Sequence, residues 1–174
     1  EIAFRLHPYF VLLHIFLGLV FGASLPFTKM RHMIMAPLYI WLRPRRHIGA
    51  LAKIEDIEET ELLGVGNINE FTSRELLSFD ACLDCGRCED VCPATASGLD
   101  YSPRTLIQSL RDDAVNALVK RNGNGSSREL SAEMFKEETL WACTTCGACL
   151  TRCPIFIRPP ERVVDLRRYA TLMT

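Results

Sequence analysis

The longest run of apolar positions lies near the start of the chain, from Tyr9 to Phe27, and contains no formally charged side chain. His14 and Ser24 are its only clearly polar residues. As a helix, these 19 residues rise about 28 Å, close to a bilayer hydrocarbon core of about 30 Å. A buried helix of a soluble protein is the alternative, but such a helix usually carries a polar stripe. The run therefore predicts a transmembrane helix.

A second apolar stretch runs from Met33 to Leu42 and contains Pro37. It is too short to span a bilayer alone. We therefore expect it to extend the first helix toward the membrane surface, with Tyr39 and Trp41 as interfacial aromatic residues. The sequence RPRRH at 43–47 then places the C-terminal side in the cytoplasm, because basic residues concentrate on that side of a membrane helix.

Beyond this point the pattern predicts short helices separated by breaks. Residues 48–70 contain three glycines and are expected to form a linker. The predicted helices begin near Thr72, run from Ser102–Pro103 to about Arg121, and cover about 131–140 and 160–173. The first two starts carry capping signals, a T-x-x-E capping box at Thr72 and a serine cap before a first-turn proline at Ser102–Pro103. Four apolar residues would face the core from the second of these helices: Leu106, Ile107, Leu110 and Leu118.

Strand patterns are absent, so the soluble part is predicted to be mostly α. The expected organisation is a transmembrane helix with an interfacial extension at 1–47, a linker at 48–70 and a cysteine-rich domain at 71–174. The formal net charge is −1, which argues against a general nucleic-acid-binding protein because phosphate binding needs a basic face.

The chemistry-bearing residues are eight cysteines in two matching runs. One run is Cys82-Leu-Asp-Cys85-Gly-Arg-Cys88-Glu-Asp-Val-Cys92-Pro93, and the other is Cys143-Thr-Thr-Cys146-Gly-Ala-Cys149-Leu-Thr-Arg-Cys153-Pro154. Both have the form C-x2-C-x2-C-x3-C-P and together they use every cysteine of the chain. This spacing is typical of bacterial-type [4Fe–4S] proteins, in which the fourth cysteine ligates the other cluster.

Two ligand sets follow from that rule. One cluster is assigned to Cys82, Cys85, Cys88 and Cys153, and the other to Cys143, Cys146, Cys149 and Cys92. The glycines at 86 and 147 would let the backbone approach each cluster and direct N–H groups at sulfur. Zinc and structural disulfides are the alternatives, but zinc sites do not call for two such quartets, and disulfides are rare in a cytoplasmic domain. The 61-residue spacing of the runs, filled by helices, points to an α-helical ferredoxin-like domain.

His14 and His32 are the candidate residues of the membrane segment. They are 18 residues apart, which is five turns and about 27 Å on a straight helix, so both would face one direction. A histidine inside a membrane suggests a functional site, and haem iron is commonly held by histidine. Alternatively, His14 bonds a neighbouring helix and His32 lies among the lipid head groups.

Two parts of the chain resemble known families. The stretch HIFLGLVFGASLPFTKMRH resembles the last membrane helix of the nitrate reductase gamma subunit family, which implies two b-type haems ligated by His14 and His32 and shared with helices outside this sequence. The phrases LSFDACLDCGRCEDVCPA and LWACTTCGACLTRCPIFI are similar to heterodisulfide-reductase-related iron–sulfur oxidoreductases. The joined order resembles membrane-bound electron-transfer-flavoprotein:quinone oxidoreductases.

The resemblance implies a mainly α fold, in which the C-terminal part of a haem-type transmembrane domain precedes a two-[4Fe–4S] ferredoxin-like domain. It implies electron transfer between a cytoplasmic flavoprotein or redox subunit and quinone or menaquinone, at the inner (cytoplasmic) membrane and with the iron–sulfur domain on the cytoplasmic side. Further membrane helices and CCG-type domains are expected partners. Two alternatives stay open: electron delivery to a quinol-linked heterodisulfide or thiol reductase, and a non-redox membrane scaffold with structural metal sites.

Overall fold

The structure is a computed structural model, which describes residues 2–47, 49–51, 63–120, 130 and 134–173. Its α-helices are α1 (Ile2–Ser24), α2 (His32–Leu42), α3 (Ser73–Asp80), α4 (Arg87–Asp90), α5 (Pro93–Ala96), α6 (Pro103–Lys120), α7 (Glu137–Ala142), α8 (Ala148–Arg152) and α9 (Pro159–Leu172). Three 3₁₀ turns are η1 (Leu25–Phe27), η2 (Lys29–Arg31) and η3 (Ile68–Glu70). The described residues contain no strand, which confirms the mainly helical fold class.

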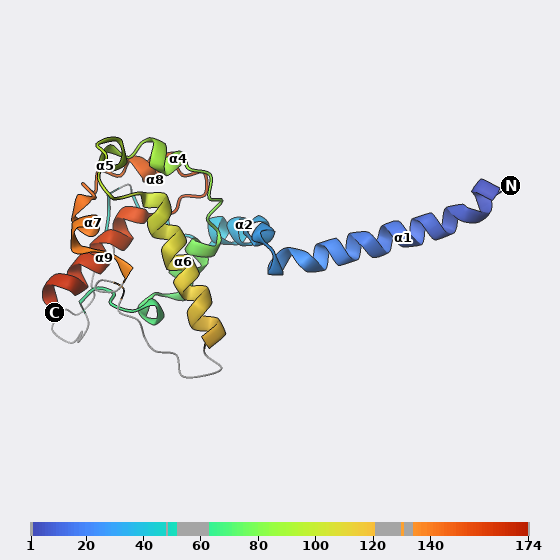
Figure 1. The fold of residues 1–174 in the computed structure, drawn as a ribbon, viewed down its shortest axis with the longest axis horizontal. Coiled ribbons are helices and arrows are strands. Elements are labelled where there is room, and N and C mark those ends of the chain that lie inside the picture. The colour runs from blue at the N-terminus through green and yellow to red at the C-terminus, as the bar shows by residue number, and fades with distance from the viewer. Residues whose placement is uncertain (1, 48, 52–62, 121–129, 131–133, 174) are drawn as a thin grey trace.

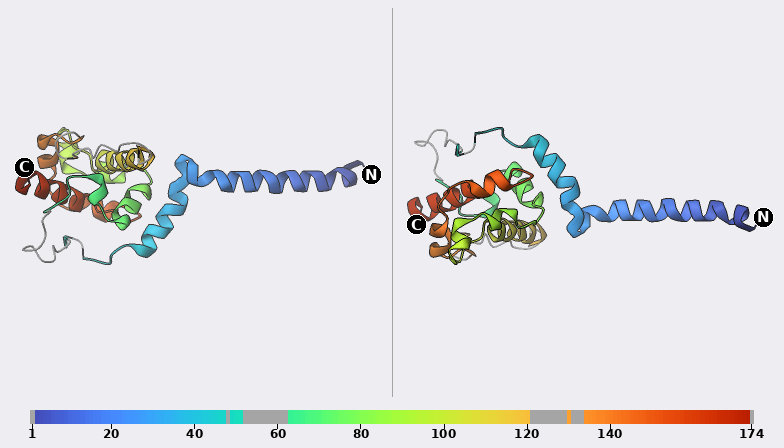
Figure 2. Two further views of the ribbon diagram at one scale, coloured as in Figure 1. Left: turned by 90° about the horizontal axis from the view of Figure 1, so that it is seen from below. Right: turned by 90° about the horizontal axis from the view of Figure 1, so that it is seen from above.

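Helix α1 projects as a single rod away from the rest of the chain (Figures 1 and 2). The apolar segment Arg5–Phe27 has a mean hydropathy of 2.1, and none of it is buried within the chain. Its length and composition are sufficient to cross a bilayer. The predicted apolar helix is therefore present, and the protein interior does not cover it.

The first two helices are not continuous, so the expected extension of one helix from Tyr9 through Leu42 is wrong. The chain passes through η1 and η2, and α2 then leaves at an angle to α1 (Figure 2). Pro26 has no N–H for the helix ladder. Thr28 is extended, with φ −107° and ψ 174°, and its side chain accepts a hydrogen bond from the Met30 N–H. Pro37, in contrast, is accommodated inside α2.

Helix α2 packs on the cysteine-rich domain rather than only lining a membrane surface. Tyr39 is 4% exposed, and its hydroxyl donates to the Phe156 carbonyl over 3.4 Å. Arg31 pairs with Asp80 at the end of α3 over 2.9 Å. The expectation that Tyr39 is an interfacial aromatic residue is therefore wrong, because it is buried against protein, whereas Trp41 is 80% exposed.

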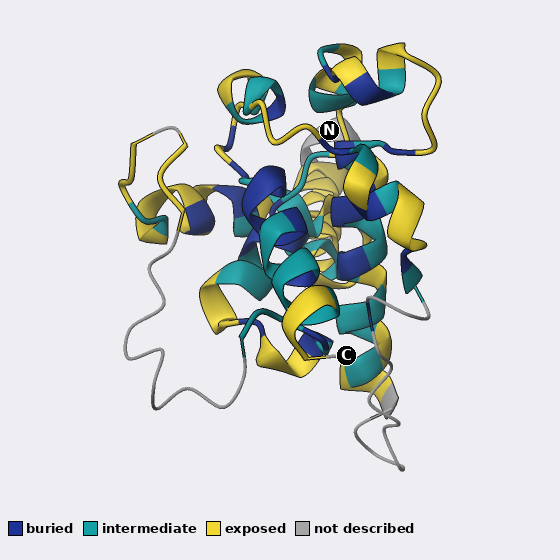
Figure 3. Cartoon of the chain, turned by 90° about the vertical axis from the view of Figure 1, so that its left-hand side faces the viewer, coloured by how far each residue is buried: buried dark blue, intermediate teal, exposed yellow. Residues whose placement is uncertain are grey.

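The core lies between α3, α6 and α9 and the turns that carry the cysteines (Figure 3). The predicted starts of α3 and α6 are confirmed: Thr72 and Glu75 form the capping box, and Ser102 Oγ accepts from the Thr105 N–H. Three of the four apolar residues expected on the core face of α6 are almost fully buried, namely Leu106, Ile107 and Leu110. Leu118 is 67% exposed, so its placement was wrong: the last turns of α6 extend past the core (Figure 1).

The end of the predicted linker is attached to α9. The Val65 N–H donates to the Asp165 carbonyl over 3.1 Å. Gly64 and Gly66 approach Tyr169 so closely that a Cβ at either position would collide with it. Glycine is needed here for this contact between two segments. Of the helix expected at about 131–140, residues 131–133 lie outside the described residues, and α7 begins at Glu137, later than expected. The tail is helical as expected, in α9.

Candidate metal centres

The first cysteine run wraps around the junction of α3 and α4. Cys82 follows α3, Cys85 lies in the turn, and Cys88 is in the first turn of α4. Gly86 is the N-cap of α4 and adopts φ 78°, a left-handed conformation that glycine tolerates without steric cost. Asp84, two residues earlier, is also left-handed with φ 53°.

The second run repeats this backbone. Gly147 is the N-cap of α8 with φ 77°, and Thr145 has φ 55°, in the places that Gly86 and Asp84 take in the first run. Alternation of ordinary and left-handed residues turns successive N–H groups toward one point, a geometry found around bound phosphates and Fe–S clusters. The repeat is therefore one of three-dimensional shape as well as of sequence.

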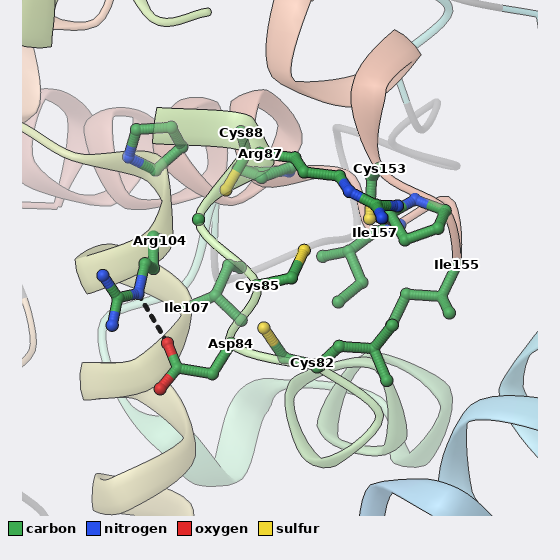
Figure 4. A pocket seen from close by; sticks show the side chains of 15 residues that line it. Cys82, Asp84, Cys85, Arg87, Cys88, Arg104, Ile107, Cys153, Ile155 and Ile157 are labelled. Carbon is green, nitrogen blue, oxygen red and sulfur yellow. Dashed lines mark hydrogen bonds and ion pairs between the residues drawn. The ribbon is translucent and has the colours of Figure 1, made fainter. Parts of the chain in front are cut away.

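The fourth cysteines cross between the loops. One cavity, of about 440 Å³ of empty space including its open mouth, is lined by Cys82, Cys85 and Cys88 of the first run and by Cys153 of the second (Figure 4). Another, of about 270 Å³, is lined by Cys143, Cys146 and Cys149 of the second run and by Cys92 of the first. The structure thus brings together each of the two sets expected from the spacing.

The two fourth cysteines leave their loops differently. Cys92 is the N-cap of α5, with Pro93 in its first turn, so the chain departs in a helix as expected. Cys153 ends α8 and enters a turn, in which Phe156 has φ 63° and the Ile157 N–H donates to Cys153 Sγ over 3.3 Å. That turn also supplies the Phe156 carbonyl bound by Tyr39 of α2.

The donor sets fit iron–sulfur clusters. Each cavity is lined by four cysteines, whose thiolates are the ligands that a [4Fe–4S] cluster requires. In the described part of the chain, no group of three Cys, His, Asp or Glu side chains is placed to hold a single metal ion. Burial, followed by the neighbouring Cys82 and Cys153, raises the pKa of Cys88 to about 11. Burial, followed by Cys143 and Cys88, raises the pKa of Cys149 to about 12. Cationic iron at the centre would remove this mutual repulsion of thiolates.

Exposure differs within each set. Cys92, Cys143 and Cys149 are buried, whereas Cys85 and Cys146, the second cysteines of the two runs, are exposed. Both sites thus have one corner near the protein surface.

Several supporting residues were not found from the sequence. Gln108 of α6 donates from Nε2 to Cys82 Sγ over 3.1 Å. Arg104 holds Asp84 of the first loop over 2.6 Å, and Arg167 of α9 donates to the carbonyls of Leu140 and Cys143 at the second loop. A polar residue such as Gln108, next to the buried positions of α6, was the available signal, but its direction depends on the tertiary packing.

The two histidines lie on different elements. His14 is exposed on α1, and His32 is the half-buried first residue of α2. Because η1 and η2 separate them, the five-turn argument that placed both on one helix face does not apply.

Comparison with known proteins agrees with the cysteine geometry. Residues 78–157 match the family described as the 4Fe-4S dicluster domain. The probable iron–sulfur-binding oxidoreductase FadF of Bacillus subtilis is 31% identical over 92% of this chain and 28% of its own length. EtfAB:quinone oxidoreductase of Syntrophomonas wolfei is 33% identical over 89% of this chain and 25% of its own length.

A probable membrane-anchored ferredoxin of Chromohalobacter salexigens is 37% identical over 69% of this chain and 21% of its own length. Several subunits of archaeal heterodisulfide reductases match 52% to 66% of this chain at 29% to 30% identity, and the one from Methanopyrus kandleri is named as an iron–sulfur subunit. The chain spans about a quarter of the length of the first three relatives. No solved structure matches the chain.

Proposed function

The chain belongs to the iron–sulfur oxidoreductases related to the heterodisulfide reductases, with a 4Fe-4S dicluster domain at 78–157, and from that premise we propose that it conducts electrons between a cytoplasmic flavoprotein and the quinone pool. In this proposal it is the electron-carrying part of a longer membrane-bound enzyme.

The observation that carries the proposal is the sharing of cysteines between the loops. The first site is formed by Cys82, Cys85, Cys88 and Cys153, and the second by Cys143, Cys146, Cys149 and Cys92. Helices α4 and α8, which carry the loops, are in contact, and Cys88 of one set is a close electrostatic neighbour of Cys149 of the other. Closely spaced centres favour stepwise electron transfer, since tunnelling weakens steeply with distance.

Reversible one-electron storage is the chemistry that a [4Fe–4S] cluster supplies when bound. The chain's residues would hold each cluster and set its reduction potential. The left-handed residues of each loop direct N–H groups inward, Gln108 donates to one ligand sulfur, and the buried cysteines limit access of water.

The position of α2 supports an order for the two centres. Tyr39 of α2 binds the turn that begins at Cys153, and Arg43 lies 3.7 Å from the centroid of the Phe156 ring in that turn. The first site is therefore adjacent to the element that leads to α1. We propose that electrons pass from the flavoprotein to the second site, then to the first site, and from there toward the membrane.

The membrane side of the proposal rests on α1. Arg5–Phe27 is long and apolar enough to cross a bilayer, and one relative is named as membrane-anchored. The basic sequence at 43–47 favours a cytoplasmic dicluster domain. The name of the Syntrophomonas relative, which includes quinone, supports the proposal of quinone as acceptor. We propose His14 and His32 as haem b ligands, on the resemblance to the nitrate reductase gamma subunit family and with partner helices outside this sequence.

The heterodisulfide reductase relatives favour a second candidate, in which the same electron path serves a disulfide or thiol substrate through CCG-type domains. The two candidates share the clusters and differ in the partner. A non-redox scaffold is the third, and it predicts structural metal without redox activity.

The test uses membranes that contain the full-length protein and are purified without oxygen. We expect about eight non-haem iron and eight acid-labile sulfide per chain from the two [4Fe–4S] clusters, with the iron of the two proposed haems in addition. An electron-transferring flavoprotein should reduce the clusters, and a quinone should reoxidise them. Reoxidation by a heterodisulfide but not by quinone would favour the second candidate. Zinc in place of iron, or no EPR signal after reduction, would contradict both and leave the scaffold.

A further inference from the structure

We propose that the Tyr101 hydroxyl donates a hydrogen bond to sulfur of the cluster held by the second set of cysteines, and that Tyr101 and Gln108 tune the two clusters separately. The inference rests on the proposed binding of clusters in the two cysteine cavities. It assigns to Tyr101 a tuning role that the cysteine spacing does not imply.

The first observation is a buried hydroxyl without a well-formed hydrogen bond to protein. Tyr101 is only 5% exposed, and among the described residues nothing accepts from its hydroxyl with ordinary hydrogen-bond geometry. Buried polar side chains nearly always have a partner, so an unpaired one calls for an explanation. The same residue lines the cavity of Cys92, Cys143 and Cys149.

The second observation is that the neighbours of this hydroxyl are sulfurs. Tyr101 lines one cavity together with all four cysteines of the second set, Cys92, Cys143, Cys146 and Cys149. A phenol has an ordinary pKa of about 10, so it keeps its proton at physiological pH and can donate a hydrogen bond. Cluster sulfur is the acceptor that would complete its hydrogen bonding.

Tyr101 is held in place by its backbone. Its N–H donates to the Leu99 carbonyl over 2.8 Å, and its carbonyl accepts from the Thr95 hydroxyl over 2.8 Å. Ser102 and Pro103, which follow directly, start α6. Since both backbone groups are fixed beside the start of a helix, the ring has little freedom to leave the cavity.

The first site has a different donor in a related position. Gln108 of α6 donates to Cys82 Sγ over 3.1 Å, and Pro103 at the start of α6 lines both cavities. The beginning of α6 therefore borders both sites, with Tyr101 serving the second site and Gln108 the first. A phenol and a carboxamide differ in donor strength, so the same segment can set two potentials.

A hydrogen bond to cluster sulfur favours the more negatively charged, reduced state and raises the reduction potential. Removing the donor should lower the potential of that cluster only. The alternative is that Tyr101 merely fills space between α6 and the second loop. Tyr101→Phe separates these readings, because it keeps the ring and removes the hydroxyl.

The experiment is an EPR-monitored redox titration of the full-length protein, purified without oxygen, as wild type, Tyr101→Phe and Gln108→Met. Cys146→Ser, which changes one ligand of the second set, identifies the signal of that cluster. We expect Tyr101→Phe to lower the midpoint potential of the second cluster, by up to about tenfold in its reduction equilibrium (about 59 mV for one electron), and to leave the first unchanged. Gln108→Met should lower the midpoint potential of the first cluster and leave that of the second unchanged.

A second measurement, made on the wild type, tests the inference even if a variant loses its cluster. Resonance Raman bands of the Fe–S(Cys) bonds should respond to exchange of water for D₂O in the wild type and respond less in Tyr101→Phe. Unchanged potentials and bands in Tyr101→Phe, with iron content retained, would overturn the inference, as would an equal shift of both clusters. A wild-type protein without clusters would instead contradict the proposed function.

Discussion

At the scale of single residues, each cysteine loop holds one non-glycine residue in a left-handed backbone conformation, which is unfavourable for residues with a side chain. Asp84 and Thr145 have φ of 53° and 55°, and a β-branched residue such as Thr145 is rare in this region. The cost is about 1–2 kcal/mol for each residue. Such strain persists only where the surroundings fix it, and it gathers at functional sites. Here it lies where N–H groups must turn toward the cysteine cavity.

The glycine of the first loop offers a test of this geometry. Gly86→Ala should cost about 1–2 kcal/mol in the left-handed conformation and reduce occupancy of the first site, because the loop must hold that shape to bind iron. Iron content and the EPR signal of that cluster measure the effect. Gly98→Ala is the matched control, since Gly98 has φ 76° and, like Gly86, has no atom near an added Cβ, but lies outside both runs. Equal iron loss in both variants would contradict the assignment.

The stability of the folded protein should depend on pH through the carboxyl group of Asp165 in α9. Burial raises its pKa to about 6, although the Arg162 charge opposes this. The folded protein thus holds a proton that the unfolded chain, with a carboxyl pKa near 3.9, has released, so stability falls as pH rises through 6. The difference amounts to at most about 3 kcal/mol at 1.36 kcal/mol per pH unit.

The apparent melting temperature should therefore decrease between pH 5 and pH 7, and Asp165→Asn should flatten this slope. Asp112→Asn is the control, since Asp112 belongs to an ion pair on α6 with a side chain 69% exposed. An unchanged slope in Asp165→Asn would assign the pH dependence to other groups.

The cysteine sets could be predicted residue by residue, whereas Tyr101 and Gln108 could not. Spacing within a run is a local property, and the crossing of the fourth cysteine is a rule of the motif. The direction of a side chain on α6 relative to loops that lie before and after it depends on packing. The sequence therefore predicts which cysteines line each cavity, but not the groups that surround their sulfurs.

At the scale of elements, the helices that carry strong local signals were predicted and the break before α2 was not. The capping box at Thr72 and the serine–proline pair at Ser102 act within one turn. The bend between α1 and α2 involves Pro26 and the extended residue Thr28, together with the packing of α2 against α3. The contact between α2 and α3 is long-range in sequence, so local patterns did not reveal that the second apolar stretch forms a separate helix.

Tyr39 provides the test of the contact between α2 and the dicluster domain. Tyr39→Ala should cost about 3–5 kcal/mol, because it empties a buried aromatic site. Tyr39→Phe should cost only about 0.5–1.5 kcal/mol, through the loss of the hydrogen bond to Phe156. The measurements are apparent melting temperature and protease sensitivity. Trp41→Ala, at an exposed position of the same helix, should change neither; equal effects at Tyr39 and Trp41 would contradict the packing.

At the scale of the whole molecule, an exposed apolar rod projects from a folded domain (Figure 1), and this domain contains two cysteine cavities. Helix α2 connects them, since it follows α1 in sequence and contacts α3, the helix that ends at the first cysteine run. The turn from Cys153 to Ile157, which α2 also contacts through Tyr39, belongs to the second run but borders the first cavity. The crossing of ligands therefore ties both loops and α2 into one unit.

This crossing makes a prediction that requires no prior assignment of spectra. Cys153→Ser should alter the same EPR signal as Cys85→Ser, although Cys153 lies 68 residues away and in the other run. Cys92→Ser should likewise alter the same signal as Cys146→Ser. If each run held its own cluster, Cys153 would pair with Cys146 and Cys92 with Cys85. Because the two schemes predict opposite pairs, the spectra of the four variants decide whether the loops exchange their fourth cysteines or each run holds its own cluster. Only the exchange of fourth cysteines makes cluster binding depend on the packing of the two runs against each other.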